Sequence, residues 1–343
     1  MSTNARLFEY IDVNPKEILT KGTLAKKISM DKLQPFCRDI PEYELAEYTG
    51  GTKFRNGDTI MARITPCLEN GKTAMVNILD ENEVGFGSTE YIVFRAKKEL
   101  TIPDFVYYLV RSSFVRELAI KSMVGSSGRQ RVQTNVVENL EIDFPSLTEQ
   151  TQIASVLKSL DDKIALNNKI NNNLEQQAQA IFKSWFVDFD PFGGNRPIDW
   201  ITGIVDDLGA EIICGKTPST KKKEYYGGNT PFITIPDMHG CVYNVSTERY
   251  LSAAGVASQP KKTLPHNTVC ISCIGTAGLV TLVSEKSQSN QQINSIVPKE
   301  GISAYYIYLL MQTLSETINK LGQSGSTIVN LNKTQFGKIP VPI

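Results

Sequence analysis

The sequence predicts an α+β protein in which two similar mixed α/β domains, each built on a twisted and mostly antiparallel sheet, are joined by one long coiled-coil-type helix. A segment between Pro145 and Asp190 has the composition and periodicity of a single helix. The segments on either side of it resemble each other. The chain has 343 residues, 41% of them hydrophobic, which is enough for two domains with buried cores.

The long helix is expected within residues 146–190. Ser146 and Glu149 form a capping-box pattern directly after a proline, and neither glycine nor proline occurs from there to Val187. Apolar residues then recur in alternating steps of four and three, with asparagine at two central positions, which is typical of a coiled-coil seam. The expected pairing positions are Ile153, Leu157, Leu160, Ile164, Asn167, Asn171, Leu174, Ala178, Ile181 and Trp185. A long exposed surface helix is the alternative.

The two flanking segments read as a degenerate duplication. In the first, alternating β-like runs at 59–64 and 91–93 precede an apolar helix at 103–123, a Gly/Ser loop and a last strand at 142–145. The second repeats this order with runs at 268–273 and 295–297, a helix at 303–321, a Gly/Ser loop and a strand at 339–342. We therefore expect domains at 1–145 and 191–343, with the helix at 146–190 between them. The second copy stops where the long helix begins in the first copy, so a second long helix is expected to be absent.

Several motifs resemble those of the specificity subunits of type I restriction–modification systems. Residues 149–171 and 179–191 are similar to the central conserved helix of that family, and 214–234 to the start of its target recognition domain. Residues 53–59 and 63–73 resemble one subgroup of the first such domain. The motifs occur in the family's order along essentially the whole chain.

The resemblance implies two target recognition domains, each reading one half of a split DNA sequence. It also implies two long helices packed antiparallel, of which this chain shows one. The implied partners are double-stranded DNA, methyltransferase (M) subunits and motor–nuclease (R) subunits, with self-association through the long helix as a further expectation. A decoy module that binds methyltransferase or another specificity subunit without reading DNA is the alternative.

No catalytic, cofactor or metal site is predicted. Cys214-Gly-Lys-Thr217 resembles a phosphate loop, but the required first glycine is replaced by Ala210, and Pro218 stands where a helix should follow. Cys270 and Cys273 have the spacing of metal ligands but lie in a strand-like run, so free buried thiols are expected. Free thiols, the lack of an apolar signal core and the lack of a membrane-length apolar run predict a cytoplasmic protein without membrane contact.

Reading DNA requires only hydrogen-bond donors, acceptors and stacking groups on loops. In the first domain the candidate contacts are Lys53, Arg55, Arg63, Lys72, Arg129, Gln130 and Arg131. In the second they are Lys216, Thr217, Ser219, Lys221, Lys222, Lys223, Tyr226, Gln291, Gln292, Ser324 and Ser326. Solvated surface polarity is the alternative for each of them. Because 36 basic residues are balanced by 36 acidic ones, strong DNA binding is expected to depend on local patches or on partner subunits.

Overall fold

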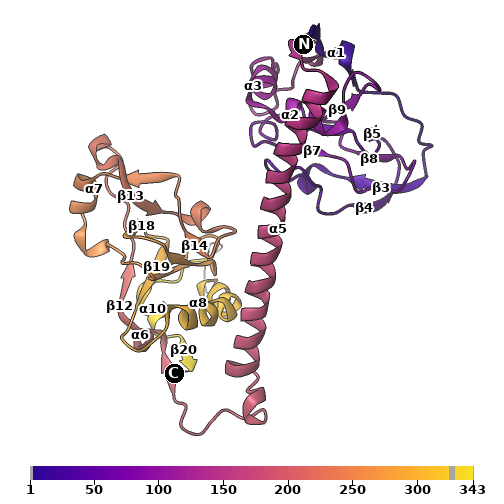
Figure 1. The fold of residues 1–343 in the computed structure, drawn as a ribbon. Coiled ribbons are helices and arrows are strands. Elements are labelled where there is room, and N and C mark those ends of the chain that lie inside the picture. The colour runs from indigo at the N-terminus through magenta and orange to yellow at the C-terminus, as the bar shows by residue number, and fades with distance from the viewer. Residues whose placement is uncertain (1–2, 324–328, 343) are drawn as a thin grey trace. The chain divides into compact units, whose positions relative to one another are not determined.

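A computed structural model describes residues 3–323 and 329–342, which divide into two compact units at Ile170/Asn171 (Figure 1). The α+β class expected from the sequence is confirmed. One continuous helix, α5 (Leu147–Phe186), contributes its first part to the first unit and its second part to the second. The reciprocal capping box is present at its start, where Ser146 N donates to Glu149 Oε2 at 2.9 Å and Glu149 N donates to Ser146 Oγ at 3.4 Å.

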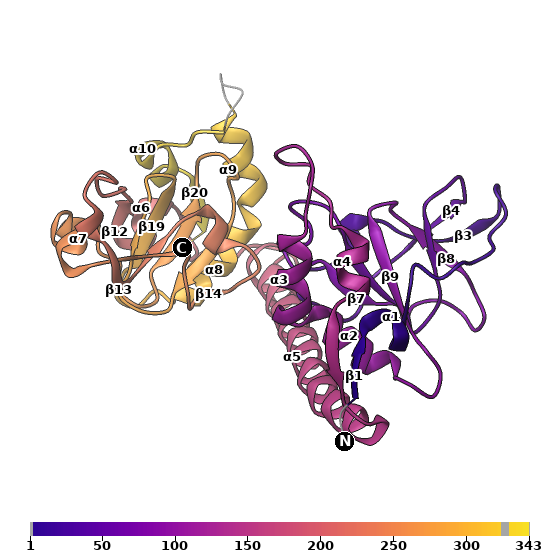
Figure 2. The ribbon, with the colours of Figure 1, turned by 90° about the horizontal axis from the view of Figure 1, so that it is seen from above.

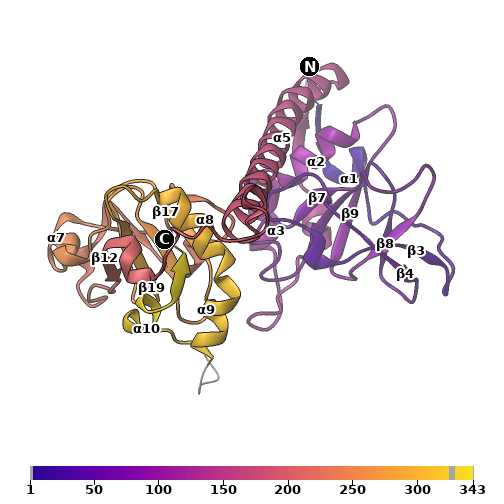
Figure 3. The ribbon, with the colours of Figure 1, turned by 90° about the horizontal axis from the view of Figure 1, so that it is seen from below.

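The first unit contains two four-stranded sheets and one strand pair. The inner sheet is antiparallel, in the order β2 (Ile11–Val13), β9 (Tyr91–Ala96), β6 (Thr59–Ala62), β7 (Thr73–Met75). The outer sheet has the order β4 (Glu44–Glu47), β3 (Leu24–Ile28), β8 (Gly85–Gly87), β5 (Thr52–Phe54), with β3 and β8 parallel. Strand β1 (Thr3–Arg6) pairs with β10 (Glu141–Phe144). Figures 2 and 3 show the outer sheet on the side of this unit that is away from α5.

In the described part of the first unit, four short α-helices complete the fold: α1 (Leu7–Tyr10), α2 (Pro103–Arg111), α3 (Ser113–Lys121) and α4 (Thr134–Glu138). Helix α2 packs against β6, β7 and β9 and buries Phe105, Val106 and Tyr107. The single helix expected at 103–123 is therefore wrong in one respect, because Ser112 divides it. Its backbone is extended (φ −55°, ψ 152°) and its hydroxyl accepts a hydrogen bond from Val115 N, which starts α3 as a new helix.

The second unit repeats this plan. Its inner sheet has five strands in the order β12 (Gly209–Cys214), β19 (Ile293–Pro298), β16 (Val269–Ser272), β17 (Val280–Val283), β14 (Tyr243–Asn244). The outer sheet has the order β15 (Arg249–Leu251), β13 (Tyr226–Ile233), β18 (Gln288–Ser289), with β13 and β18 parallel. Strand β11 (Thr202–Ile204) pairs with β20 (Pro340–Pro342). The strand that opens each globular domain therefore pairs with the strand that closes it.

The α-helices that follow α5 in the described part of the second unit are α6 (Val205–Leu208), α7 (Ala253–Ala257), α8 (Ala304–Thr313), α9 (Ser315–Gly322) and α10 (Lys333–Gly337). Helix α8 packs on β16 and β17, as α2 packs on the inner sheet of the first unit. The helix expected at 303–321 is likewise two helices, α8 and α9, which meet at Leu314. Beyond α5, the backbone turns at Phe189, whose φ of 58° is left-handed, and at Gly193 and Gly194.

Candidate functional site

The face of α5 that carries the predicted pairing positions is exposed in the described part of the chain. Its large apolar side chains range from 36% exposed at Leu157 to 61% at Ile181, and Asn167 and Asn171 are exposed with them. Ala178 is half-buried. Val156, Leu166 and Ile170 widen the apolar surface. An apolar face of this length is unfavourable in water, so it fits a helix that packs against another helix.

A different face of α5 holds the two globular domains. In the first unit, Gln150 is fully buried and bonds to Leu100 O, Pro145 O and the Thr101 hydroxyl. Ala154 lies in the core, and the Tyr108 hydroxyl donates to Asp161 at 3.0 Å. Burial and the hydrogen bond to Asp161 raise the pKa of Tyr108 to about 12, so the phenol remains a donor.

In the second unit, a tyrosine and buried apolar side chains contact the second part of α5 in the same way. Tyr308, which stands in α8 where Tyr108 stands in α2, donates to Glu175 at 3.0 Å. Phe182 is 3% exposed and packs 4.9 Å from the Phe186 ring and 5.5 Å from the Tyr306 ring. Four of the residues that hold the domains lie on one seven-residue repeat, and each directly follows a seam position: Ala154, Asp161, Glu175 and Phe182. Asn168 is the position midway between them. The seam face and the domain-holding face are thus adjacent stripes of one helix.

In the first unit, some DNA candidates are engaged by other protein groups. Arg131 donates to Glu90 with Nε at 2.9 Å and Nη2 at 2.6 Å, and this hydrogen bond lowers the pKa of Glu90 against the opposing effect of burial. Arg55 pairs with the buried Glu17 at 2.7 Å. Lys72 donates to Met30 O, and Arg63 donates to Val132 O.

The remaining candidates of this unit are less engaged. Arg129 is exposed and forms no ion pair among the residues described. Gln130 is half-buried, and its backbone oxygen accepts from Thr65 N. Lys53 lies 5.8 Å from the centre of the Tyr48 ring. The contact with Glu90 could not be found from the sequence, because Glu90 precedes β9 and lies 41 positions from Arg131.

In the second unit, the loop that follows β12 is held by the side-chain amides of two buried glutamines, Gln259 and Gln288. Gln259 donates to Lys216 O at 2.7 Å and to Gln288 Oε1 at 2.8 Å. On the exposed side, the Thr217 hydroxyl donates to Gln291 Oε1 at 2.7 Å, so these two candidates lie together. Gln292 accepts from Asn290 Nδ2 at 2.9 Å. This network holds the loop while leaving the side chains of Lys216 and Ser219 exposed.

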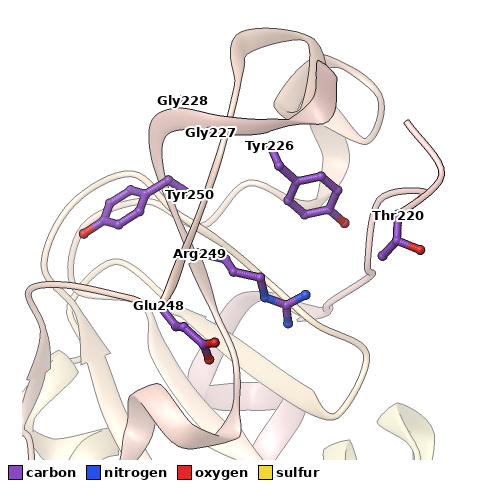
Figure 4. A pocket seen from close by; sticks show the side chains of 7 residues that line it. All are labelled: Thr220, Tyr226, Gly227, Gly228, Glu248, Arg249 and Tyr250. Atoms are coloured by element: carbon purple, nitrogen blue, oxygen red, sulfur yellow. The ribbon is translucent and has the colours of Figure 1, made fainter. Parts of the chain in front are cut away.

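A pocket of about 440 Å³ lies where this loop meets the outer sheet (Figure 4). It is lined by Thr220, Tyr226, Gly227, Gly228, Glu248, Arg249 and Tyr250. Tyr226, a sequence candidate, is positioned by a 2.7 Å hydrogen bond from its hydroxyl to Pro218 O. The neighbouring candidates Lys221, Lys222 and Lys223 are exposed, and Lys222 contacts Tyr225. Ser324 and Ser326 lie outside the described residues.

Three residues of this pocket, Glu248, Arg249 and Tyr250, were not among the candidates predicted from the sequence. They lie in a segment without the Gly-rich or clustered-basic pattern that pointed to the other candidates. Strand β15 brings them to the pocket, because it pairs with β13 in the antiparallel register Phe232↔Arg249 and Pro231↔Tyr250. The signal for them is therefore tertiary.

The two cysteines with metal-ligand spacing are buried in and after β16. Burial raises the pKa of both thiols, Cys270 and Cys273, to about 12, so they are protonated at neutral pH. Within residues 3–323 and 329–342, no three His, Cys, Asp or Glu side chains are grouped so as to hold a metal ion. None of the described helices combines the length and apolar character needed to cross a lipid bilayer.

Comparison with known proteins gives matches along the whole chain. A family model described as Type I restriction modification DNA specificity domain matches residues 10–176 and again residues 197–343. The HindI specificity subunit of Haemophilus influenzae, a type I restriction enzyme component, is 33% identical over 357 residues, covering 84% of this chain and 76% of that subunit. The MjaIX specificity subunit of Methanocaldococcus jannaschii is 31% identical over 153 residues, covering 43% of this chain and 35% of that subunit.

Among solved structures, the S subunit of a type I restriction–modification system from M. genitalium aligns with 100% of this chain and 84% of its own, with a TM-score of 0.59. At 15% sequence identity, this similarity is one of fold. The fold of this chain is therefore also found in a solved structure.

Proposed function

Since the chain belongs to the family of type I restriction–modification DNA specificity domains, we propose that it reads a bipartite DNA site, one half with each of its two globular domains. The observation that carries this proposal is the double match of the family model, once to each half of a structurally duplicated chain. Specificity subunits are the non-catalytic members of these systems, so the chain itself is not an enzyme. It provides sequence recognition to a type I restriction–modification complex.

The proposed partners are double-stranded DNA, methyltransferase subunits and motor–nuclease subunits. The zero formal charge supports a division of labour, because phosphate neutralisation supplies most non-specific affinity for DNA. Under this proposal, the methyltransferase subunits provide much of the phosphate contact and this chain selects the sequence. Its exposed candidates, such as Arg129 and Lys216, then need only contact DNA locally.

An electrophoretic mobility-shift assay, with and without the cognate methyltransferase subunit, tests this function. The methylated motif is first obtained from the methylome of cells that express the complex, and duplexes with either half-site scrambled serve as competitors. We expect tight binding to the intact bipartite duplex by the complex and weaker binding by the chain alone. Absence of sequence-specific binding by both preparations would refute the proposed function.

The seam of α5 is proposed to pair with the same helix of a second copy, running antiparallel. Two antiparallel copies centred on Lys169 would place Ile164 opposite Leu174, and Asn167 opposite Asn171. Apolar residues would then face apolar residues and the two polar layers would meet at the centre, where buried asparagines favour one register. This pairing would cover the face that is exposed in the single chain.

Ile164→Glu is expected to abolish this pairing, since it places a charge in the seam without touching either globular domain. Lys169→Glu also changes a charge near the centre of α5 but lies off the seam, so it should pair like the wild type. Analytical ultracentrifugation over a range of concentrations separates the two. A wild-type chain that stays monomeric throughout, with no crosslink from its helix to any partner subunit, would rule the pairing out.

A further inference from the structure

We propose that Arg249 reads a guanine in the half-site of the second domain, with Glu248 beside it accepting from the paired cytosine. This inference rests on the proposed function and assigns one base pair of specificity to the pocket of Figure 4. A G·C pair offers guanine O6 and N7 as acceptors and the cytosine amino group as a donor in the major groove. An arginine and a carboxylate side by side match that pattern.

The geometry presents Arg249 as an oriented but unused donor. Its guanidinium carbon lies 5.4 Å from the ring centre of Phe232, a fully buried residue directly across the sheet. Within the described part of the chain, no carboxylate forms an ion pair with Arg249, and its guanidinium donates no hydrogen bond. Figure 4 shows its side chain directed toward the space between Tyr226 and Thr220. The ring therefore supports a planar donor fork that remains free for a ligand.

The equivalent position in the first domain has a different chemistry. In each outer sheet, a central strand pairs in parallel on one side and antiparallel on the other, and the registers place Lys27 where the second domain has Phe232. The residue across from Lys27 is Glu44, which corresponds to Arg249. Lys27 and Glu44 neutralise each other at 3.4 Å. The second domain thus carries a free cation where the first carries a closed ion pair, which is expected if this position reads a base in one half-site alone.

The surrounding charges favour a base edge over a phosphate as the ligand. Glu248 lines the same pocket and would repel a phosphate group, whereas it can accept from the cytosine amino group. Phosphate contact is better assigned to the exposed lysines of the adjoining loop, Lys221 and Lys223, since lysine acts as a point charge. Lys221 and Lys223 lie in the loop that directly follows Thr220, which lines the pocket, so phosphate-type and base-reading groups are close in the chain without sharing the pocket.

The test uses the full chain assembled with its methyltransferase subunit and carrying R249K or R249Q. The methylome gives the motif of each complex, and competition binding to duplexes changed at one base pair at a time gives discrimination at every position. R249K keeps the charge and the aliphatic stem over Phe232 but loses the bidentate fork. We expect it to lower discrimination at one G·C position of one half-site by about tenfold or more, with non-specific binding nearly unchanged. R249Q should shift that position toward adenine, which glutamine pairs with.

Two controls define what would overturn the inference. Lys223→Ala, a phosphate-type change, should weaken binding to all duplexes equally and reduce the salt dependence. Glu44→Gln, at the equivalent position of the first domain, should leave the half-site of the second domain intact. Arg249 is not a base reader if R249K and R249Q retain the wild-type motif with unchanged discrimination, or if they weaken all sequences equally as Lys223→Ala does. If the wild-type complex yields no bipartite motif, the proposed function itself has failed.

Discussion

At the scale of single residues, the buried carboxylate of Glu17 forms an ion pair with Arg55, one of the candidate DNA contacts. Glu17 accepts from Arg55 at 2.7 Å and from Arg95 at 2.6 Å. Burial alone would raise the pKa of Glu17, but the hydrogen bonds and charges of the two arginines outweigh burial and hold the pKa below its ordinary value. A carboxyl whose pKa is lowered by folding stabilises the folded state above its unfolded pKa, and this contribution is lost as the pH falls through the folded pKa.

Glu17→Gln is therefore expected to destabilise the first unit at neutral pH by about 1–3 kcal/mol, since a charge-assisted hydrogen bond is lost. The difference from wild type should shrink as the pH falls below the ordinary carboxyl pKa of 4.5 and through the lowered pKa of the folded state, because the wild-type carboxyl then becomes protonated as well. Urea unfolding at pH 7 and pH 3.5, followed by hydrogen exchange in peptides of the first unit, measures both effects. Glu81→Gln, at an exposed carboxylate of the same unit, is the control. An equal loss of stability at both pH values would contradict the explanation.

At the scale of one element, neighbouring residues of α5 have different roles: Phe182 attaches the second globular domain, whereas Ile181 lies on the face proposed to pair with another helix. Phe182→Ala removes a ring that is 3% exposed and should lower the unfolding free energy of the second unit by about 3–5 kcal/mol. Ile181→Ala removes an apolar side chain that is 61% exposed and should change this free energy by no more than about 0.5 kcal/mol while weakening helix pairing. Both tryptophans of the chain, Trp185 and Trp200, lie near this end of α5, so their fluorescence during urea unfolding reports the second unit. Similar losses for the two variants would mean that the two faces are not distinct.

The same helix shows how far the sequence determines the structure. The seam periodicity, the capping box and the glycines after Phe189 predict the existence of α5 and place its ends closely, since these signals are local. Which face holds the domains could not be predicted, because nothing in the sequence marks Asp161 and Glu175 as the partners of Tyr108 and Tyr308. Arg249 could not be predicted for a related reason. The ring that its guanidinium packs over belongs to Phe232, and the sequence pattern does not reveal that these two residues are paired across neighbouring strands.

At the scale of the whole molecule, the length of α5 is expected to set the spacing of the DNA site. Four residues inserted after Lys169 would add about 6 Å of helix between the segments that hold the two domains. With DNA rising about 3.4 Å per base pair, the methylated motif should gain about two base pairs of spacer while both half-sites stay the same. Methylome sequencing of cells that carry the extended chain reads out both quantities. An unchanged spacer would show that α5 does not determine the separation.

The neutral charge of the molecule gives a second expectation at this scale. If partner subunits make most of the phosphate contacts, the affinity of the assembled complex should fall more steeply with salt than that of the chain alone. Titrations of one fluorescent duplex between about 50 and 200 mM salt give the two slopes. Equal slopes would place the phosphate contacts on this chain.

The exposed stretch of α5 between its two attachment sites has a consequence for how such a chain can change. Residues 163–174 are all exposed, so no domain core depends on their side chains. A crossover between two related genes within this stretch would deliver each globular domain together with its own attachment residues, Ala154 and Asp161 in one parent or Glu175 and Phe182 in the other. The hybrid would inherit two intact cores and a new combination of half-sites in a single step. The architecture thus allows new DNA targets to arise by exchange of halves, without redesign of either domain.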